Sequence, residues 1–231
     1  MSKKRHQRRQ VVTGTGSVRR SEKPTLPETG GSVLELVMVV ALFGTLTAIA
    51  LALVLQTYKG VQLQLISSTL FDSGAAALNQ MTKELRVAGY PSAKVFSSSA
   101  VANSPGLVAT AYVSVTPYDL VFQSDADGNG AVAQIEYVLA SGSQNLYRKS
   151  TLKNLDGTLA MSTQTTLLVN QVQNQVQGTP LFSWEVDPSN PQPFPLNVRA
   201  IFINLVLASG GGESGVPATL TLTATCPRMN F

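Results

Sequence analysis

The hydrophobic pattern of the chain begins with one long run of residues that carries no charge. From Leu36 to Tyr58 there are 23 such residues, mostly Leu, Val and Ala. About 20 consecutive apolar residues are enough to span a bilayer as a helix. A cleavable secretory signal has a shorter apolar region, typically about 7–15 residues. The pattern therefore predicts a membrane helix that remains in the mature protein.

Beyond the uncharged run, apolar residues recur at the spacing of a helix. Their steps are three, four and seven residues, and they comprise Leu63, Ile66, Leu70, Ala77, Met81 and Leu85. This spacing is typical of an amphipathic helix. Gly89 and Pro91 supply a C-terminal stop. We therefore expect one continuous helix from Val33 to Ala88, whose second half buries its apolar stripe against the following domain.

After Pro91 the pattern changes to an alternation of period two, which is typical of strands. The expected strands cover residues 107–115, 118–124, 132–139, 144–150, 180–186, 198–207 and 218–225. The Gln- and Asn-rich residues 169–178 are interpreted as a polar connection or a short helix. An antiparallel sheet packed against one long helix is an α+β arrangement.

Charge is spread unevenly along the 231 residues. Residues 1–30 hold eight of the 17 Lys and Arg but only two of the 13 acids, so the remaining 201 residues carry a net charge of −2. The overall charge of +4 is therefore no direct sign of a nucleic-acid partner. Basic residues before an apolar helix place the N-terminus in the cytoplasm and the C-terminal body outside.

The inventory of reactive side chains argues against catalysis. The single cysteine is Cys226, and the only histidine, His6, lies in the basic leader. A Ser-His-Asp or Cys-His arrangement in the body is excluded, as are zinc sites built from several cysteines. Trp184 and Cys226 are interpreted as packing residues, and Lys83, Glu84 and Arg86 as a solvated helix face. We expect no enzymatic activity.

Glu35 stands out because it opens the apolar run, where a carboxylate is costly and usually functional. The alternative is that Glu35 lies at the headgroup level, favoured by the helix dipole. The preceding residues match two processing motifs. The sequence LPETG, Leu26 to Gly30, spells a wall-sorting signal. Such signals lie at the end of a chain, however, and more than 170 residues follow this apolar run, so we interpret the match as coincidence.

The second match concerns Gly30, the apolar residues after it, Glu35 and the long helix. This order resembles the type IV prepilin family, in which a basic leader is cut after a glycine and a glutamate is the fifth mature residue. Gly31 departs from the family, which most often has Phe at that position. The sequence LRVAGYP, Leu85 to Pro91, also resembles the helix end of PilW-type minor pilins.

The resemblance implies cleavage by prepilin peptidase between Gly30 and Gly31, with N-methylation of the new terminus. It also implies the pilin fold, with the long helix packed on an antiparallel sheet. The expected organisation is a cleaved basic leader of residues 1–30, a long helix of residues 31–90 that spans the membrane in its first half, and a β-rich domain of residues 91–231.

The implied function is a structural subunit, of the minor type, in a type IV pilus or a type II secretion pseudopilus. Its partners would be other pilin subunits, prepilin peptidase, the inner-membrane assembly platform and, before assembly, the lipid bilayer. Glu35 would pair with the free terminus of a neighbouring subunit. The expected location is a single pass through the cytoplasmic membrane, followed by an extracytoplasmic filament. The alternative function is a membrane-anchored binding module that does not polymerise.

One segment of the body fits a calcium-loop template. Asp125, Asp127, Asn129, Gly130 and Glu136 fall in register with it, and their oxygen donors suit a hard cation. Because Asp, Asn and Gly are also the standard turn residues, and the flanking residues look like paired strands, we favour a β-hairpin turn over a calcium site here. No cofactor is expected, apart from calcium if this loop binds it.

Overall fold

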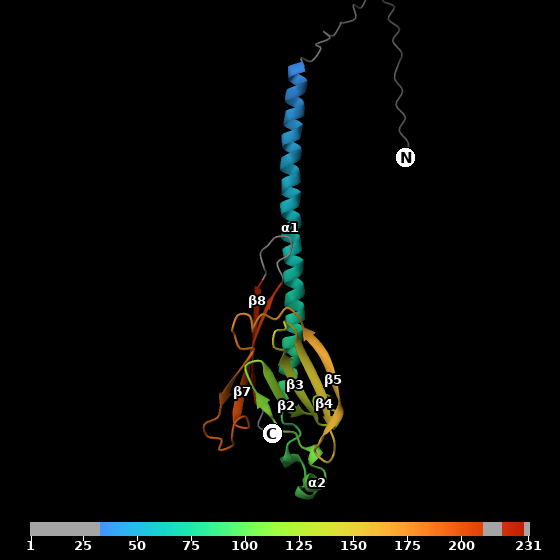
Figure 1. Cartoon of the computed structure of the whole chain (residues 1–231), viewed down its shortest axis with the longest axis vertical. Helices are drawn as coiled ribbons and strands as arrows, with labels where there is room; N and C mark the ends of the chain where they lie inside the picture. Colours follow the sequence, from blue (N-terminus) through green and yellow to red (C-terminus); the bar gives the residue numbers. More distant parts are fainter. Residues whose placement is uncertain (1–32, 210–218, 229–231) are drawn as a thin grey trace, which may run out of the picture. The chain divides into compact units, whose positions relative to one another are not determined.

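The computed structural model describes residues 33–209 and 219–228, which fall into two units that divide between Leu51 and Ala52. A long helix, α1 (Val33–Arg86), begins in the first unit and ends in the second. Three short helical elements follow it: η1 (Ala93–Val95), α2 (Ser98–Asn103) and η2 (Pro105–Leu107). The rest of the second unit is built from strands (Figure 1).

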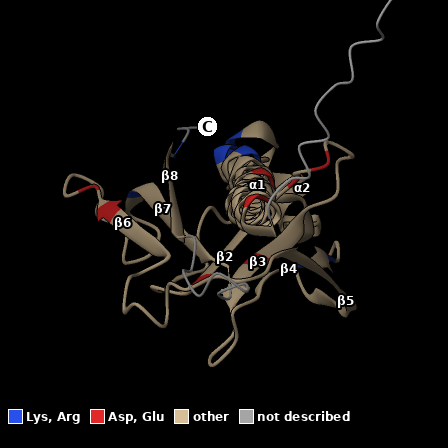
Figure 2. Ribbon diagram, turned by 90° about the horizontal axis from the view of Figure 1, so that it is seen from above, with Lys and Arg blue, Asp and Glu red and all other residues tan. Residues whose placement is uncertain are grey.

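The strands form two antiparallel sheets. The first sheet has the order β1-β2-β3-β4-β5 and the second has the order β6-β7-β8. The strand bounds are β1 Ser114–Val115, β2 Asp119–Ser124, β3 Ala133–Leu139, β4 Leu146–Lys153, β5 Leu159–Val169, β6 Phe182–Val186, β7 Val198–Ala208 and β8 Thr219–Pro227. An end-on view shows β6–β8 to the left of the helix and β2–β5 below it (Figure 2). The α+β arrangement expected from the sequence is thus present.

The predicted apolar stripe of α1 is the helix's contribution to the core. Leu70, Ala77, Met81 and Leu85 are buried, while Leu63 and Ile66 are half-buried. The stripe packs with the inward side chains of both sheets, which include Phe122, Ile135, Tyr137, Phe182, Ile201 and Leu207. The buried residues of the described chain all lie at or beyond Leu70, so the second unit holds the hydrophobic core.

The helix ends close to the predicted stop. α1 ends at Arg86, and Gly89 follows with a φ of +83°, a conformation that glycine adopts without a steric penalty. The N–H of Gly89 donates to the carbonyl oxygen of Gln123 at 2.8 Å. The turn that follows the helix is thereby tied to β2.

Two expectations about the β domain were wrong. Residues 107–115 were expected to form one long strand, but only Ser114–Val115 form a strand, β1, and Thr110 and Val113 make single backbone hydrogen bonds to β2. The second error is that no strand was expected where the structure has β5. Residues 169–178 form a connection, in which Val172 makes an isolated bridge to Leu207.

Gly74 lets the helix approach the second sheet closely. A Cβ atom at this position would lie 2.6 Å from Cδ1 of Leu207 and 2.7 Å from Cδ1 of Leu222. Both distances are shorter than van der Waals contact, and these side chains belong to β7 and β8. Gly60, on the same helix, has no atom within 4 Å of the corresponding position. The two glycines therefore differ in their packing although both are helical.

Replacing Gly74 with valine should destabilise the protein by about 1–3 kcal/mol, because overpacking forces neighbouring side chains to move. Gly60→Val is the matched control and should change the stability by less than about 0.5 kcal/mol. Urea unfolding of the chain in detergent, followed by circular dichroism, measures both. Equal unfolding midpoints for the two variants would contradict the close approach.

Candidate functional site

The first half of α1 is apolar on every side. Large apolar side chains from Val33 to Tyr58 are exposed all around the helix. A helix that is hydrophobic all round is either buried in protein or surrounded by lipid. This stretch is long and apolar enough to cross a membrane, and none of its most apolar window is buried against the described residues.

Glu35 lies in the first turn of this apolar helix. It lines a shallow hollow of about 220 Å³ together with Met38, Val39, Leu42 and Phe43. These residues follow Glu35 by three, four, seven and eight positions, so they share its face of the helix. The carboxylate is therefore the polar member of an otherwise apolar face. If another helix or lipid covered that face, the charge would need a partner.

The two glycines of the predicted cleavage site, Gly30 and Gly31, lie outside the described residues. Among the described residues, Glu35 has no hydrogen-bond or ion-pair partner. Its carboxylate is thus available to a group from another molecule or from the part of the chain before Val33.

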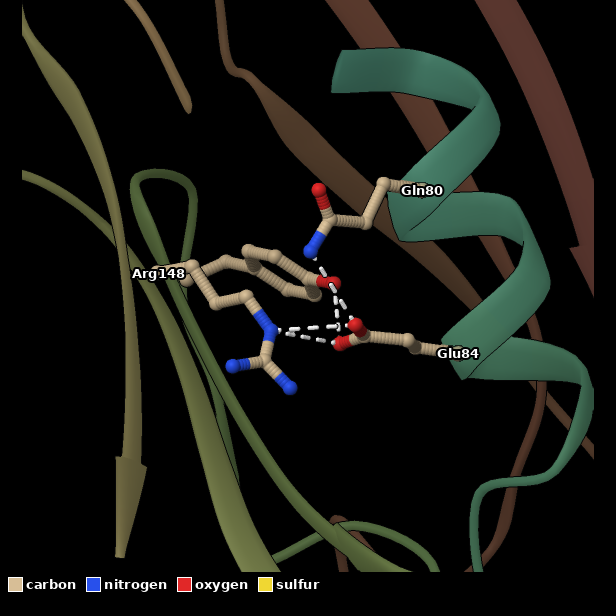
Figure 3. Close-up of polar contacts among 4 residues, drawn as sticks. Gln80, Glu84 and Arg148 are labelled. Atoms are coloured by element: carbon tan, nitrogen blue, oxygen red, sulfur yellow. Dashed lines mark hydrogen bonds and ion pairs between the residues drawn. The ribbon is translucent and has the colours of Figure 1, made fainter. Parts of the chain in front are cut away.

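A second carboxylate, Glu84, lies near the other end of α1 in the opposite situation. The hydroxyl of Tyr137 on β3 donates to Oε2 of Glu84 at 2.6 Å. The Nε of Arg148 on β4 lies 3.0 Å from both carboxylate oxygens, and Nε2 of Gln80 donates to Oε1 at 3.2 Å. Figure 3 shows the three labelled side chains pointing toward one another from the helix and the sheet.

The prediction that Glu84 belongs to a solvated helix face was wrong. Its neighbours Lys83 and Arg86 are exposed, but Glu84 itself is buried. The sequence carries a signal for this, because Glu84 follows the buried Ala77 and Met81 by seven and three residues. It therefore shares their face of the helix. A charged residue within a buried stripe indicates a buried partner on the opposing sheet.

The environment of this carboxylate alters the titration of Tyr137. Burial raises the pKa of Tyr137, and the negative charge of Glu84 and the hydrogen bond to it raise the pKa further. The neutral phenol is therefore the form that the fold favours. Tyr112, another buried tyrosine, has its pKa raised to about 12, chiefly by burial. Its hydroxyl has no partner among the described residues.

The acidic segment after β2 forms a turn held by its own side chains. The carboxylate of Asp125 accepts hydrogen bonds from the N–H groups of Asn129 and Gly130, at 3.0 and 2.9 Å. The side-chain oxygen of Asn129 accepts one from the N–H of Ala131 at 2.8 Å. Asp127 is exposed and has no hydrogen bond or ion pair within the described chain. Asp125 and Asn129 therefore have backbone partners of the kind a turn supplies.

Glu136, the last residue of the calcium template, does not join this turn. It lies on β3, where its Oε1 accepts from Nζ of Lys149 at 2.7 Å. It also lies near Asp119, whose pKa is raised by burial and by the charge of Glu136. Within residues 33–209 and 219–228, no three His, Cys, Asp or Glu side chains are grouped closely enough to hold a metal ion. The structure therefore does not bring the predicted ligands together.

The two packing residues named from the sequence lie in the second sheet. Cys226 is buried and makes no disulfide, and burial raises the pKa of its thiol. A buried thiol with a raised pKa is chemically inert. Trp184 is half-buried against the core, and its ring lies 5.6 Å from that of Phe194, measured between centroids.

Comparison of the chain with models of known protein families, with curated proteins and with solved structures found no match. The function must therefore be inferred from the residues and contacts of this chain. The features that bear on it are the apolar helix, the carboxylate at its start and the network that fixes its other end to the sheet.

Replacing Glu84 with alanine should destabilise the protein by about 3–5 kcal/mol, because it leaves the Arg148 guanidinium buried without its counter-charge. Replacing both Glu84 and Arg148 with leucine should cost less than the single change, because no buried charge then remains. Chemical unfolding of each variant gives the comparison.

The exposed ion pair between Glu185 and Arg199 serves as the control. Glu185→Ala should leave the unfolding midpoint nearly unchanged, because an ion pair in water contributes little. If Glu84→Ala were as mild as this control, the network would not hold the helix to the sheet.

The raised pKa of Tyr137 predicts a loss of stability at high pH. In the unfolded chain a tyrosine has a pKa of about 10. Because the pKa of Tyr137 is higher in the folded protein, its neutral phenol contributes fully to the free energy of unfolding below pH 10, and this contribution is lost as the pH rises further. Tyr137→Phe should therefore cost about 1.5–3 kcal/mol at pH 7, where it removes a hydrogen bond to a charged group. Above pH 10 this cost should shrink, since the variant has no phenol to ionise.

Tyr112→Phe is the matched control for this titration. It removes a hydroxyl that has no partner among the described residues, so it should cost little at pH 7. Between pH 10 and about 12 it should make the protein relatively more stable than the wild type. Unfolding curves from pH 7 to 12 would test both. A cost for Tyr137→Phe that did not change with pH would contradict the assignment.

Proposed function

We propose that this chain is a structural subunit of the type IV prepilin kind, a minor pilin or pseudopilin that acts by assembly. One observation carries the proposal: a single helix, α1, is apolar on all sides in its first part and amphipathic in its second, where it packs on antiparallel sheets. Such a helix suits a subunit that is stored in a membrane and then packed against other helices. The basic leader and Gly30 before it support processing by prepilin peptidase.

In this proposal Glu35 directs assembly. Cleavage after Gly30 would create a free amine at Gly31, four residues before the carboxylate. In apolar surroundings an isolated charge is costly, whereas a paired one is tolerated. The carboxylate of an incoming subunit therefore pairs with the free amine of its neighbour. This pairing would fix the axial offset between two helices that otherwise offer only apolar surface.

The second part of α1 contributes the mechanical link that such a subunit needs. Glu84 is held by side chains from two strands, and Gly74 lies in close approach to two more. Displacing the helix along its axis would expose the buried carboxylate and break the packing at the glycine. A load on the helix is therefore passed to the β domain through both sheets.

Two variants separate processing from assembly in cells that contain the peptidase. Gly30→Val should leave the precursor uncut, larger than the mature chain by about 3 kDa, the share of 24.5 kDa that 30 of 231 residues carry. Glu35→Ala should be cut and inserted in the membrane but absent from sheared filaments, because the neighbour's amine then has no counter-charge. Mass spectrometry of the N-terminus and immunoblots of the fractions give the readout.

Leu26→Ala is the matched control, since it destroys the LPETG match and leaves Gly30 and Glu35 in place. Its mature chain should still begin at Gly31 and enter filaments. A mature N-terminus at any other residue, or a processing defect caused by Leu26→Ala, would overturn the proposal. Normal recovery of Glu35→Ala in filaments would remove the role of the carboxylate.

A further inference from the structure

Strand β5 is the open edge of the larger sheet. It is 11 residues long and pairs only with β4, on one side. Residues 161–167 are all exposed, and the side chain of Met161 is fully exposed. No strand among the described residues pairs with the outer edge of β5. Its backbone N–H and C=O groups on that side are thus free to pair with another strand.

β5 lacks the features that normally keep an exposed edge strand from pairing with another chain. Edge strands are usually kept apart by charged side chains, by proline or by being short. β5, with the sequence LAMSTQTTLLV, contains no charged residue and no proline (Figure 2). The other edge strands differ from β5. β1 and β6 are short, with two and five residues. β8 ends in Pro227, and its Leu222 side chain lies against α1.

We propose that β5 pairs with β5 of a second copy of this chain, antiparallel, so that the two larger sheets become continuous. The pattern of β5 is self-complementary in this direction. Exposed apolar residues lie toward its ends, Leu159 and Met161 at one and Leu167 at the other, with Ser, Thr and Gln between them. Antiparallel pairing sets the apolar end of one copy beside the opposite apolar end of the other.

Charge also favours a second copy as the partner. A strand without charges offers nothing for a charged foreign strand to recognise, but it meets its own copy without repulsion. The two-fold arrangement is the usual symmetry of paired identical chains. Because β5 extends for about 37 Å at 3.4 Å per residue, the contact is narrow. We expect a weak dimer, since stable interfaces bury more area than one strand edge provides.

If the chain is a filament subunit, as proposed above, the two-fold pairing of β5 limits which subunits can pair. All helices in one filament point the same way, whereas the two-fold axis that makes two β5 strands antiparallel also reverses one helix relative to the other. β5 pairs would therefore join subunits of two different filaments that run in opposite directions. Many weak contacts along two such filaments would add up to a strong one. The pairing of two chains does not itself require filaments, so it can be measured on the isolated protein.

The test uses the full chain in dodecyl maltoside micelles, with the protein mass measured by light scattering over a range of concentrations. Thr163→Glu places a charge near the middle of β5, so that two copies repel each other. The fold should tolerate it, because Thr163 is exposed and its side chain makes one exposed hydrogen bond across the ladder, to Oγ1 of Thr151 on β4 at 2.8 Å. We expect a concentration-dependent dimer for the wild type and at least tenfold weaker association for Thr163→Glu.

Charge reversal and a matched control identify the strand. An equimolar mixture of Thr163→Glu and Thr163→Lys should recover the dimer, because opposite charges then meet. Thr223→Glu, at an exposed threonine on the other long edge strand, β8, should associate like the wild type. Single cysteines at Thr163 or Gln164 should form an intermolecular disulfide, whereas the wild type, whose Cys226 is buried, should not.

A folded wild type that stays monomeric at all concentrations would overturn the proposal, and so would equal association of the wild type and Thr163→Glu. If Thr223→Glu lost the dimer while Thr163→Glu kept it, the dimer contact would lie on β8, and the proposal for β5 would again be overturned. The result is independent of the processing experiment. Cleavage after Gly30 is read from the N-terminal mass, so either proposal can fail while the other stands.

Discussion

The carboxylate of Glu84 is the constraint on which the position of the helix depends. A buried charge costs several kcal/mol unless it is paired and hydrogen-bonded. Glu84 finds its partners in Tyr137 and Arg148, which face each other on adjacent strands, and in Gln80 one turn earlier. Sliding the helix by one turn, or rotating it, would remove these partners at once. The apolar stripe alone is less selective, because one leucine can replace another in a hydrophobic contact. The ionic network therefore selects one register for α1 on the first sheet.

The second sheet constrains the same helix through shape. At Gly74 the backbone of α1 approaches the side chains of Leu207 and Leu222 so closely that a methyl group would not fit without movement. The two sheets are also connected to each other, because the N–H groups of Leu181 and Phe182 both donate to the carbonyl oxygen of Pro117. The helix, the first sheet and the second sheet thus form one core. For a subunit whose proposed work is to transmit load from a helix to a domain, a polar constraint from one sheet and a steric constraint from the other are complementary.

The sequence predicted those parts of this structure that are governed by periodicity. The long helix, its apolar stripe and its stop at Gly89 follow from spacing and from glycine and proline, which act locally. β5 was missed because its middle is a run of Ser, Thr and Gln that no apolar alternation marks. Residues 107–115 were given too long a strand because their apolar composition does not show that only Ser114–Val115 form a regular ladder with β2. For the segment that fits the calcium template, Asp125 and Asn129 make the contacts of a turn. Glu136 lies on a strand, as expected for residues 132–139, where Lys149 is its partner. Each error concerns pairing between distant residues, which local patterns do not encode.

The carboxylates of Glu84 and Glu35, both on α1, differ in whether the described chain supplies them with hydrogen-bond donors. Glu84 and Glu35 both lie on apolar faces of one helix, yet the chain supplies three donors to Glu84 and, among the described residues, none to Glu35. The first is satisfied by the fold and stabilises it. The second needs water, a lipid headgroup, another molecule or the part of the chain before Val33 as its partner, and water is lost as soon as the surrounding apolar face is covered. The outer edge of β5 is in the same position, since its backbone groups are solvated in the single chain. If the chain assembles as we propose, both groups would find their partners in another copy.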